Sequence, residues 1–140
     1  MKQMLLVLFI ASASASLAQD GIVDMKPHKI VMQFSVGDSL EQVSVIGQIG
    51  NIRAAWPKAV IEVVCHSSGL DLLTTRKSKV ASSLADLSSK GVVFAACGNT
   101  MRRKNLKKED LLSSSVIVPS AMLELVIKQE KGWAYVKGAH

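Results

Sequence analysis

An uninterrupted run of apolar residues at positions 92–96 constrains the fold of this chain more than any other feature of its sequence. The run includes two β-branched valines and does not alternate with polar residues, which is typical of a strand in a parallel sheet covered on both faces. Strand-like and helix-like segments alternate along the remainder of the chain, as in α/β proteins. The sequence therefore predicts an α/β fold with helices on both sides of a sheet.

The predicted elements form one domain. Asp38 is expected to cap the first helix, with Glu41 as its reciprocal partner in a capping box. Together the elements predict a three-layer α/β/α domain with a mainly parallel sheet of about five strands and right-handed crossovers, of flavodoxin-like or Rossmann-like type. Strands are expected at residues 29–35, 60–65, 91–96, 116–118 and 133–136, and helices at residues 39–56, 80–87, 109–112 and 121–131.

The first 18 residues have the pattern of a signal peptide rather than of a folded element. Lys2 gives a positive start, residues 4–10 form an apolar segment, and residues 16–18 are a cleavage site of the small-x-small type. Alternating Ala and Ser at residues 11–16 dilute a segment already short for spanning a bilayer. We therefore expect cleavage after Ala18 and a periplasmic or secreted protein that does not contact the membrane after cleavage.

The mature chain has the size of a single domain. Removal of 18 of the 140 residues leaves 122, enough to bury one core. Residues 19–28 are expected to form a flexible N-terminus before a domain at residues 29–140. Loss of Lys2 lowers the net charge from +6 to +5. Aromatic residues are too few and too scattered for a stacking platform, so we expect no nucleic-acid partner.

Cys97 directly follows the apolar run. Gly98 and Asn99 tolerate unusual backbone angles, which predicts a sharp turn that leaves the thiol at the carboxyl edge of the sheet, where α/β proteins bind ligands. The positive charge of the basic residues that follow would lower the pKa of Cys97 and favour the nucleophilic thiolate. A helix N-terminus would act in the same direction if one faces the sulfur. The alternative for Cys97 is a buried cysteine that only fills the core. The alternative for the basic segment is a solvated loop that only keeps the protein soluble. The basic side chains that follow are Arg102, Arg103, Lys104, Lys107 and Lys108.

The predicted apolar strand is followed by Cys97, then by four residues, and then by Arg102 and Arg103. This segment resembles the active-cysteine segment of the DsrE/DsrF family, which includes subunits of the Tus-type sulfur relay. The similarity extends from residue 29 to residue 136. The resemblance implies a small α/β subunit, commonly in trimers or hexamers, whose cysteine carries sulfur as a persulfide. Cys97 would be that cysteine, and Arg102 and Arg103 the matching arginines.

The same resemblance implies partners that donate and accept sulfur, either proteins or small persulfides. Any catalysis would be at most that of a sulfurtransferase-like carrier. One feature departs from the family pattern: the relay proteins of this kind are cytoplasmic, whereas this chain begins like an exported protein.

Cys65 and His66 end another predicted strand and are expected at the same edge of the sheet. His66 would be a base or a hydrogen-bond partner for a thiol or ligand, unless its role is structural. A disulfide between Cys65 and Cys97 requires neighbouring strands, because the two Cα atoms must lie about 4.4–6.8 Å apart. Export favours such a disulfide, whereas a reactive Cys97 requires its absence. Two cysteines and one nearby histidine leave a zinc site incomplete, so no metal is expected.

Two further functions are compatible with the sequence. A non-catalytic oligomeric module would use the basic cleft to bind a small anion or a protein partner. Residues 37–40, Gly-Asp-Ser-Leu, also spell the GDSL signature of a lipase and esterase family, in which Ser39 would be the nucleophile. The family's G-x-N-D pattern is missing, because residues 97–100 read Cys-Gly-Asn-Thr. Its late D-x-x-H pattern is missing too, because Lys137 stands three residues before His140. No Walker or G-x-G-x-x-G loop is present, so no cofactor is expected.

Overall fold

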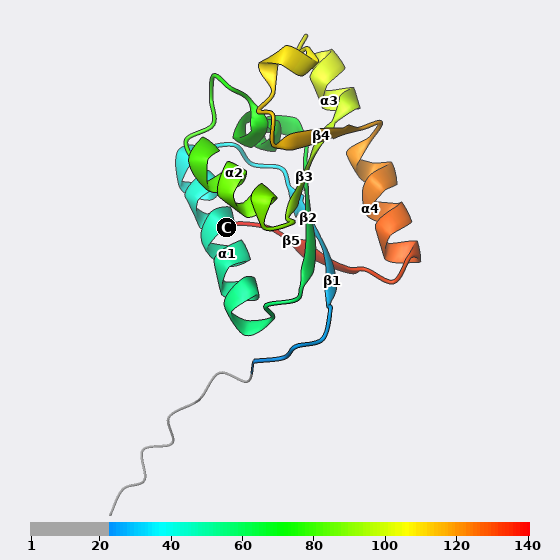
Figure 1. Cartoon of the computed structure of the whole chain (residues 1–140). Helices are drawn as coiled ribbons and strands as arrows, with labels where there is room; N and C mark the ends of the chain where they lie inside the picture. The colour runs from blue at the N-terminus through cyan, green and yellow to red at the C-terminus, as the bar shows by residue number, and fades with distance from the viewer. Residues whose placement is uncertain (1–22) are drawn as a thin grey trace, which may run out of the picture.

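The computed structural model describes residues 23–140, which contain a five-stranded parallel sheet in the order β4-β3-β2-β1-β5 (Figure 1). Its strands are β1 (Lys29–Phe34), β2 (Val60–Cys65), β3 (Val93–Cys97), β4 (Ser115–Val118) and β5 (Ala134–Lys137). The α-helices are α1 (Ser39–Ala55), α2 (Ala81–Ser89), α3 (Gly98–Arg103) and α4 (Ala121–Glu130). Two 3-10 helices, η1 (Ser67–Leu73) and η2 (Lys108–Asp110), follow β2 and α3.

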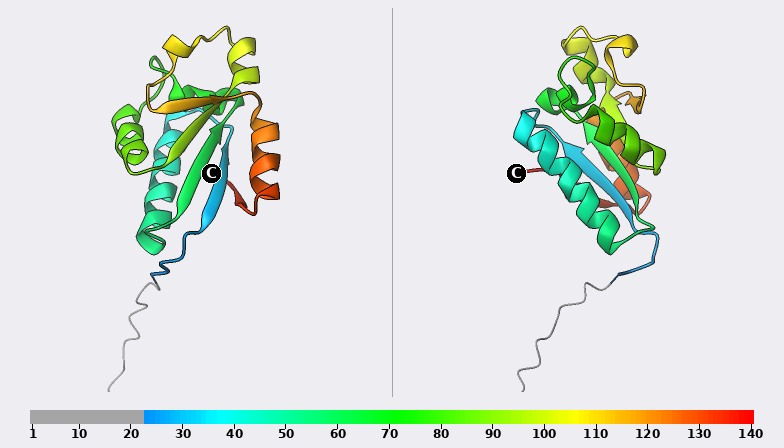
Figure 2. Two further views of the ribbon diagram at one scale, coloured as in Figure 1. Left: turned by 45° about the vertical axis from the view of Figure 1, so that its right-hand side comes forward. Right: turned by 60° about the vertical axis from the view of Figure 1, so that its left-hand side comes forward.

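Helices cover both faces of the sheet. Helices α1 and α2 pack on one face, and α4 lies on the other (Figures 1 and 2). Strands β1 to β4 lie side by side in chain order, and the connection through α4 returns the chain to pair β5 with β1. The predicted α/β class, three layers and parallel five-stranded sheet are confirmed.

The predicted signal peptide, residues 1–18, lies outside the described residues, as do residues 19–22. The described part of the expected flexible N-terminus contacts the end of α1. The N–H of Asp24 donates to the carbonyl of Ala55 at 3.0 Å, and the ring centroids of His28 and Trp56 are 4.2 Å apart. None of the helices within residues 23–140 is long and apolar enough to cross a bilayer.

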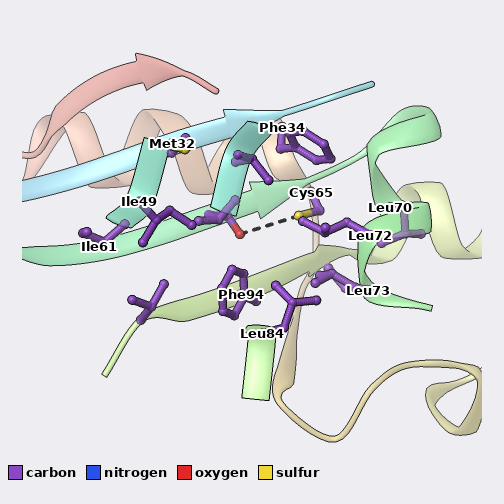
Figure 3. Close-up of a cluster of buried hydrophobic side chains, with 14 of the residues drawn as sticks. Met32, Phe34, Ile49, Ile61, Cys65, Leu70, Leu72, Leu73, Leu84 and Phe94 are labelled. Carbon is purple, nitrogen blue, oxygen red and sulfur yellow. Dashed lines mark hydrogen bonds between the residues drawn. The ribbon is translucent and has the colours of Figure 1, made fainter. Parts of the chain in front are cut away.

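Two hydrophobic cores lie on opposite faces of the sheet, because successive side chains of a strand point to opposite sides. Cys65 belongs to the larger core, between the sheet and helices α1 and α2 (Figure 3). The largest fully buried apolar side chains of this core include Met32, Phe34, Ile49, Ile61, Leu70, Leu72, Leu73, Leu84 and Phe94. The smaller core, beneath α4, contains Val31, Val64, Ala95, Cys97, Ala121 and Leu125.

The Gly-Asp-Ser-Leu segment begins α1. The carboxylate of Asp38 accepts the N–H groups of Leu40 at 3.1 Å and Glu41 at 3.0 Å, so Asp38 caps the helix as expected. The Glu41 carboxylate, expected to complete a capping box, instead accepts the N–H of His140 at 2.7 Å. A Cβ on Gly37 would lie 2.0 Å from the Ser68 carbonyl oxygen, so only glycine permits this close approach.

Candidate functional site

Cys97 is the last residue of β3 and the N-cap of α3, so a buried strand leads directly into a helix. Its side chain lies on the α4 face, in the cluster with Val64 and Ala95. The N–H of Ala121, the first residue of α4, donates to the Cys97 sulfur across 3.3 Å. The sulfur is therefore close to the N-terminal ends of two helices, where N–H groups favour negative charge.

A cavity of about 490 Å³ lies beside Cys97 at the carboxyl edge of the sheet, where the sequence predicted a ligand site. Cys97 itself is only 4% exposed, so a small reactant is favoured over a bulky one. The walls come from the end of β2, the end of β3, helix α3 and the start of α4. The lining residues are His66, Cys97, Asn99, Thr100, Arg102, Arg103, Ser120, Ala121 and Met122.

Hydrogen-bond donors outweigh burial at the Cys97 sulfur. Burial by itself raises the pKa of a thiol, because the charged form loses its hydration. The N–H groups of Ala121, Thr100 and Asn99, with the hydroxyl of Thr100, nevertheless hold the pKa of Cys97 below its ordinary value. The thiolate is thus stabilised chiefly by these neutral donors, and the arginines expected to lower the pKa are not the main cause.

Gly98 and Asn99 do not form the predicted sharp turn. They are the first two residues of α3, and neither has a positive φ. Gly98 instead permits a close contact: a Cβ there would lie 3.1 Å from the carbonyl oxygen of Val118 and 3.2 Å from that of Pro119. The contact keeps the connection between β4 and α4 against Cys97. The side-chain oxygen of Asn99 accepts a hydrogen bond from the Arg102 guanidinium.

The basic segment divides into two groups. Arg102 and Arg103 line the Cys97 cavity. Lys104 instead forms an ion pair with Asp71 at 2.8 Å. Lys107 and Lys108 do not line this cavity. The positive charge at the cavity therefore comes from the two arginines.

His66 lines the cavity, but both of its ring nitrogens already have partners. Nε2 accepts from the Gln33 amide at 2.7 Å, and Nδ1 donates to the Ser67 hydroxyl at 2.9 Å. We assign this tautomer because the Gln33 amide oxygen accepts from Tyr135, which turns the amide N–H toward His66. Burial, with the charge of Arg103, lowers the pKa of His66 and favours the neutral ring. His66 therefore has no free lone pair with which to act as a base, one of the two roles that the sequence suggested for it.

Cys65 lies on the opposite face of the sheet from Cys97. Strands β2 and β3 are neighbours, but Cys65 is in register with Ala96. Adjacent residues of a strand point to opposite faces, so the two thiols are separated by the sheet, and both are free. Burial raises the pKa of Cys65. Cys65 is therefore a core residue and not a second thiol of the cavity.

The esterase-like tetrad lies outside this cavity. Ser39 is the exposed first residue of α1, and its neighbours cap and pack that helix. The late histidine, His140, pairs with Glu41 through Nδ1 at 3.5 Å. Local structure therefore accounts for the tetrad without a catalytic serine.

Sequence reasoning missed Thr100, Ser120, Ala121 and Met122. For Thr100 a signal was available, because the third residue after an N-cap directs its N–H toward the cap side chain. The other three residues reach the cavity because β4 lies beside β3 and α4 follows β4. Strand order cannot be read from a single sequence.

Within residues 23–140, no group of three or more His, Cys, Asp or Glu side chains is arranged to hold a metal ion.

Comparisons with known proteins agree with the fold and the resemblance. A protein of unknown function from Methanobacterium thermoautotrophicum has a solved structure with a TM-score of 0.75 and 31% sequence identity. The match covers 79% of this chain and 98% of that chain. No curated protein matches the sequence. The sequence model of the DsrE/DsrF-like family matches residues 31–137, which include Cys97 and both arginines. With most of its length inside this match, the protein belongs to the DsrE/DsrF-like family.

Proposed function

We propose that Cys97 binds or relays sulfane sulfur as a persulfide. The observation that carries the proposal is the hydrogen bond from the Ala121 N–H to the Cys97 sulfur, 3.3 Å long, at the wall of a cavity. This bond and the donors on Asn99 and Thr100 favour the thiolate despite burial. Thiolates are the nucleophiles of thiol and persulfide exchange. The family of this chain, which includes sulfur-relay subunits, supports the same function.

In the proposed reaction, the Cys97 thiolate attacks the outer sulfur of a donor persulfide, R–S–SH. An S–S bond forms on Cys97 while the S–S bond of the donor breaks, and the donor leaves as the thiolate R–S⁻. The transferred sulfur keeps its proton. A thiolate of the acceptor then attacks that outer sulfur, and the electron pair of the broken bond returns to Cys97. Sulfane sulfur changes carrier with no net oxidation or reduction.

Arg102 and Arg103 would stabilise the thiolate R–S⁻ as it leaves in the cavity, because guanidinium groups stay charged and bind anions in a fixed geometry. The bond from Arg102 to Asn99 would orient one of them. Gly98 would keep the start of α4 close to the sulfur. His66 would contribute hydrogen bonds and no proton transfer.

We propose that this chemistry takes place in the periplasm or outside the cell, and the signal-peptide pattern in residues 1–18 supports this location. Disulfides form readily in such compartments and would inactivate a carrier thiol. The separation of Cys65 and Cys97 onto opposite faces of the sheet removes the one partner within the chain. The fold is thus compatible with a free reactive thiol after export.

Release of bound sulfur as thiocyanate tests the proposal. The protein is loaded with polysulfide, desalted and treated with cyanide, which removes the outer sulfur of a persulfide. Wild type and Cys65→Ala are expected to release stoichiometric thiocyanate, and Cys97→Ser none. Equal release from the two cysteine variants would contradict the assignment of the carrier.

One surface feature favours a second candidate, a non-catalytic oligomeric module that binds a small anion or protein. Helix α4 exposes Met122, Leu123, Val126 and Ile127, each between 41% and 60%. A continuous exposed apolar face of this kind is typical of contact with another protein. Met122 also lines the Cys97 cavity, so a second copy on this face would lie at the cavity. A trimer or hexamer, as the family resemblance implies, would cover it.

One measurement separates this candidate from the carrier, and a second tests the assembly itself. A binding module predicts that Cys97→Ser keeps its affinity for a small anion, while Arg102→Ala with Arg103→Ala loses it. The pair Lys107→Ala with Lys108→Ala is the matched control, because it removes the same charge away from the cavity. Light scattering is expected to show an oligomer that dissociates in Val126→Glu, and a monomeric wild type would contradict the assembly.

A further inference from the structure

Thr100 is a buried polar residue of the Cys97 cavity that the sequence did not single out. It lies in the first turn of α3 and is only 2% exposed. A buried hydroxyl must find its hydrogen-bond partners within the protein. Its oxygen accepts the N–H of Ser67 at 3.2 Å and, at the longer distance of 3.5 Å, a guanidinium N–H of Arg103.

These two partners leave the Thr100 hydroxyl free to donate its proton to a third group. A hydroxyl has one proton to donate and two lone pairs to accept with. Ser67 N–H and Arg103 are both donors, so they occupy the lone pairs and leave the proton for an acceptor. The Cys97 sulfur is the acceptor that the geometry offers, because Cys97 is the N-cap of α3, Thr100 is the third residue of that helix, and both line the same cavity. A contribution of the Thr100 hydroxyl to the lowered pKa of Cys97 agrees with this. The sulfur also accepts the Ala121 N–H.

A chain of hydrogen bonds fixes Ser67, whose N–H holds Thr100 in this orientation. Tyr135 donates to the Gln33 amide, the amide donates to His66, and His66 donates to the Ser67 hydroxyl. Ser67 has φ of 53°, a left-handed conformation that is uncommon for residues other than glycine. In this conformation its N–H donates to Thr100. The chain therefore runs from the β5 edge of the sheet to the side chain beside Cys97.

We infer that the Thr100 hydroxyl is a dedicated hydrogen-bond donor to Cys97, and that His66 and Ser67 position it. The inference rests on the proposed function, in which Cys97 attacks as a thiolate and becomes a thiolate again after each transfer. Thr100 acts on the reacting sulfur itself, whereas His66 and Ser67 act through Thr100. This arrangement also explains why a histidine lines the cavity with both ring nitrogens already bonded.

The test measures the pH dependence of Cys97 alkylation by iodoacetamide, with each cysteine followed by peptide mass spectrometry. Thr100→Val removes the hydroxyl at nearly constant volume, and we expect the midpoint of the profile to rise by about one to two pH units. Thr100→Ser keeps a hydroxyl and is expected to stay near wild type. Thr74→Val is the matched control, because it removes another buried threonine hydroxyl, one that donates to the Asp71 carbonyl at 3.2 Å.

An unchanged midpoint in a folded Thr100→Val protein, or equal shifts in the valine and serine variants, would overturn the inference. If the valine variant does not fold, Thr100→Ala against Thr100→Ser gives the same comparison with the same two outcomes. For the positioning residue, His66→Ala is expected to shift the midpoint in the same direction by less, with no added shift in the double variant with Thr100→Val. Additive shifts would contradict positioning through Thr100.

Alkylation needs no sulfur donor, so this test is independent of persulfide transfer. A shift in Thr100→Val in a protein that takes up no sulfur would support the hydroxyl donor and refute the carrier. An unshifted profile in a protein that still carries persulfide would refute the hydroxyl donor and support the carrier.

Discussion

Cys65 and Cys97 end neighbouring parallel strands, yet the structure gives the two thiols opposite properties. Cys65 pairs in register with Ala96, so Cys97 lies one residue further along the edge and on the other face. Cys65 is in the core beneath α1 and α2, where burial raises its pKa. Cys97 is at a cavity beside two helix N-termini, where donors lower its pKa. A one-residue difference in position thus separates a thiol whose pKa is raised from one whose pKa is lowered.

The difference also explains why neighbouring strands do not produce a disulfide here. Strand spacing alone would bring two end cysteines within bonding range. Opposite side-chain directions prevent it, and the Cys65 thiol instead donates a hydrogen bond to the carbonyl of Val63 at 3.9 Å.

The largest expected contrast is in the rate of alkylation of the folded protein. Cys97 is expected to react with iodoacetamide at least about a hundredfold faster than Cys65 at neutral pH, because Cys65 becomes accessible only when the core opens. Peptide mass spectrometry over time measures both sites in one sample. In urea above the unfolding midpoint the rates are expected to converge, and similar rates in the native protein would remove the contrast.

The next contrast is in stability. Cys65→Ser places a hydroxyl in an apolar core and is expected to lower the free energy of unfolding by about 1–3 kcal/mol. Cys97→Ser keeps an acceptor for the Ala121 N–H and is expected to cost less than about 1 kcal/mol. Urea unfolding followed by circular dichroism measures both. A larger loss in Cys97→Ser would mean that Cys97 is the structural cysteine.

Gly98→Ala should weaken Cys97 without affecting Cys65. The added methyl group would press on the carbonyls of Val118 and Pro119 and move the start of α4 away from the sulfur. We expect alkylation of Cys97 at neutral pH to slow about threefold or more, as the thiolate loses a donor. Gly50→Ala is the control, since no atom other than the adjacent backbone of its own helix and its chain neighbours lies within 4 Å of its Cβ position. Equal rates in the two variants would show that this close contact does not matter.

The smallest contrast is in the pH dependence of stability. The raised pKa of Cys65 means that its contribution is complete below the ordinary thiol value of 9.0 and is lost as pH rises above it. The lowered pKa of Cys97 has the opposite sign: its contribution is present above 9.0 and is lost as pH falls through the folded-state pKa. Urea unfolding between pH 7 and pH 10 should therefore show less alkaline loss in Cys65→Ala and more in Cys97→Ser. The same pH dependence in both variants would contradict the opposite shifts.

Much of the fold was predictable because apolar patterns mark buried strands directly. The continuous run before Cys97 indicates a strand covered on both faces, and β3 is such a strand. The position of Cys97 at the carboxyl edge followed from the same pattern. Arg102 and Arg103 were placed near the thiol by their short distance in sequence, and both line its cavity.

The rest of the site depends on contacts between distant segments. Ala121 donates to Cys97 across 24 positions in sequence, and Ser67 donates to Thr100 across 33. The separation of the two thiols depends on the register of β2 against β3, which no local pattern specifies. The sequence suggests that Gly98 is needed for its backbone freedom. In the structure it is needed because it has no side chain, which permits close packing against the start of α4. Local propensity thus predicts the elements, and tertiary contacts determine their chemistry.

Peptide mass spectrometry of the protein, isolated without reductant and exposed to polysulfide, tests directly whether Cys97 is the sulfur carrier. We expect added sulfur on Cys97 and none on Cys65, with no disulfide between the two cysteines. Sulfur on Cys65, a disulfide between the two, or an unreactive Cys97 would contradict it.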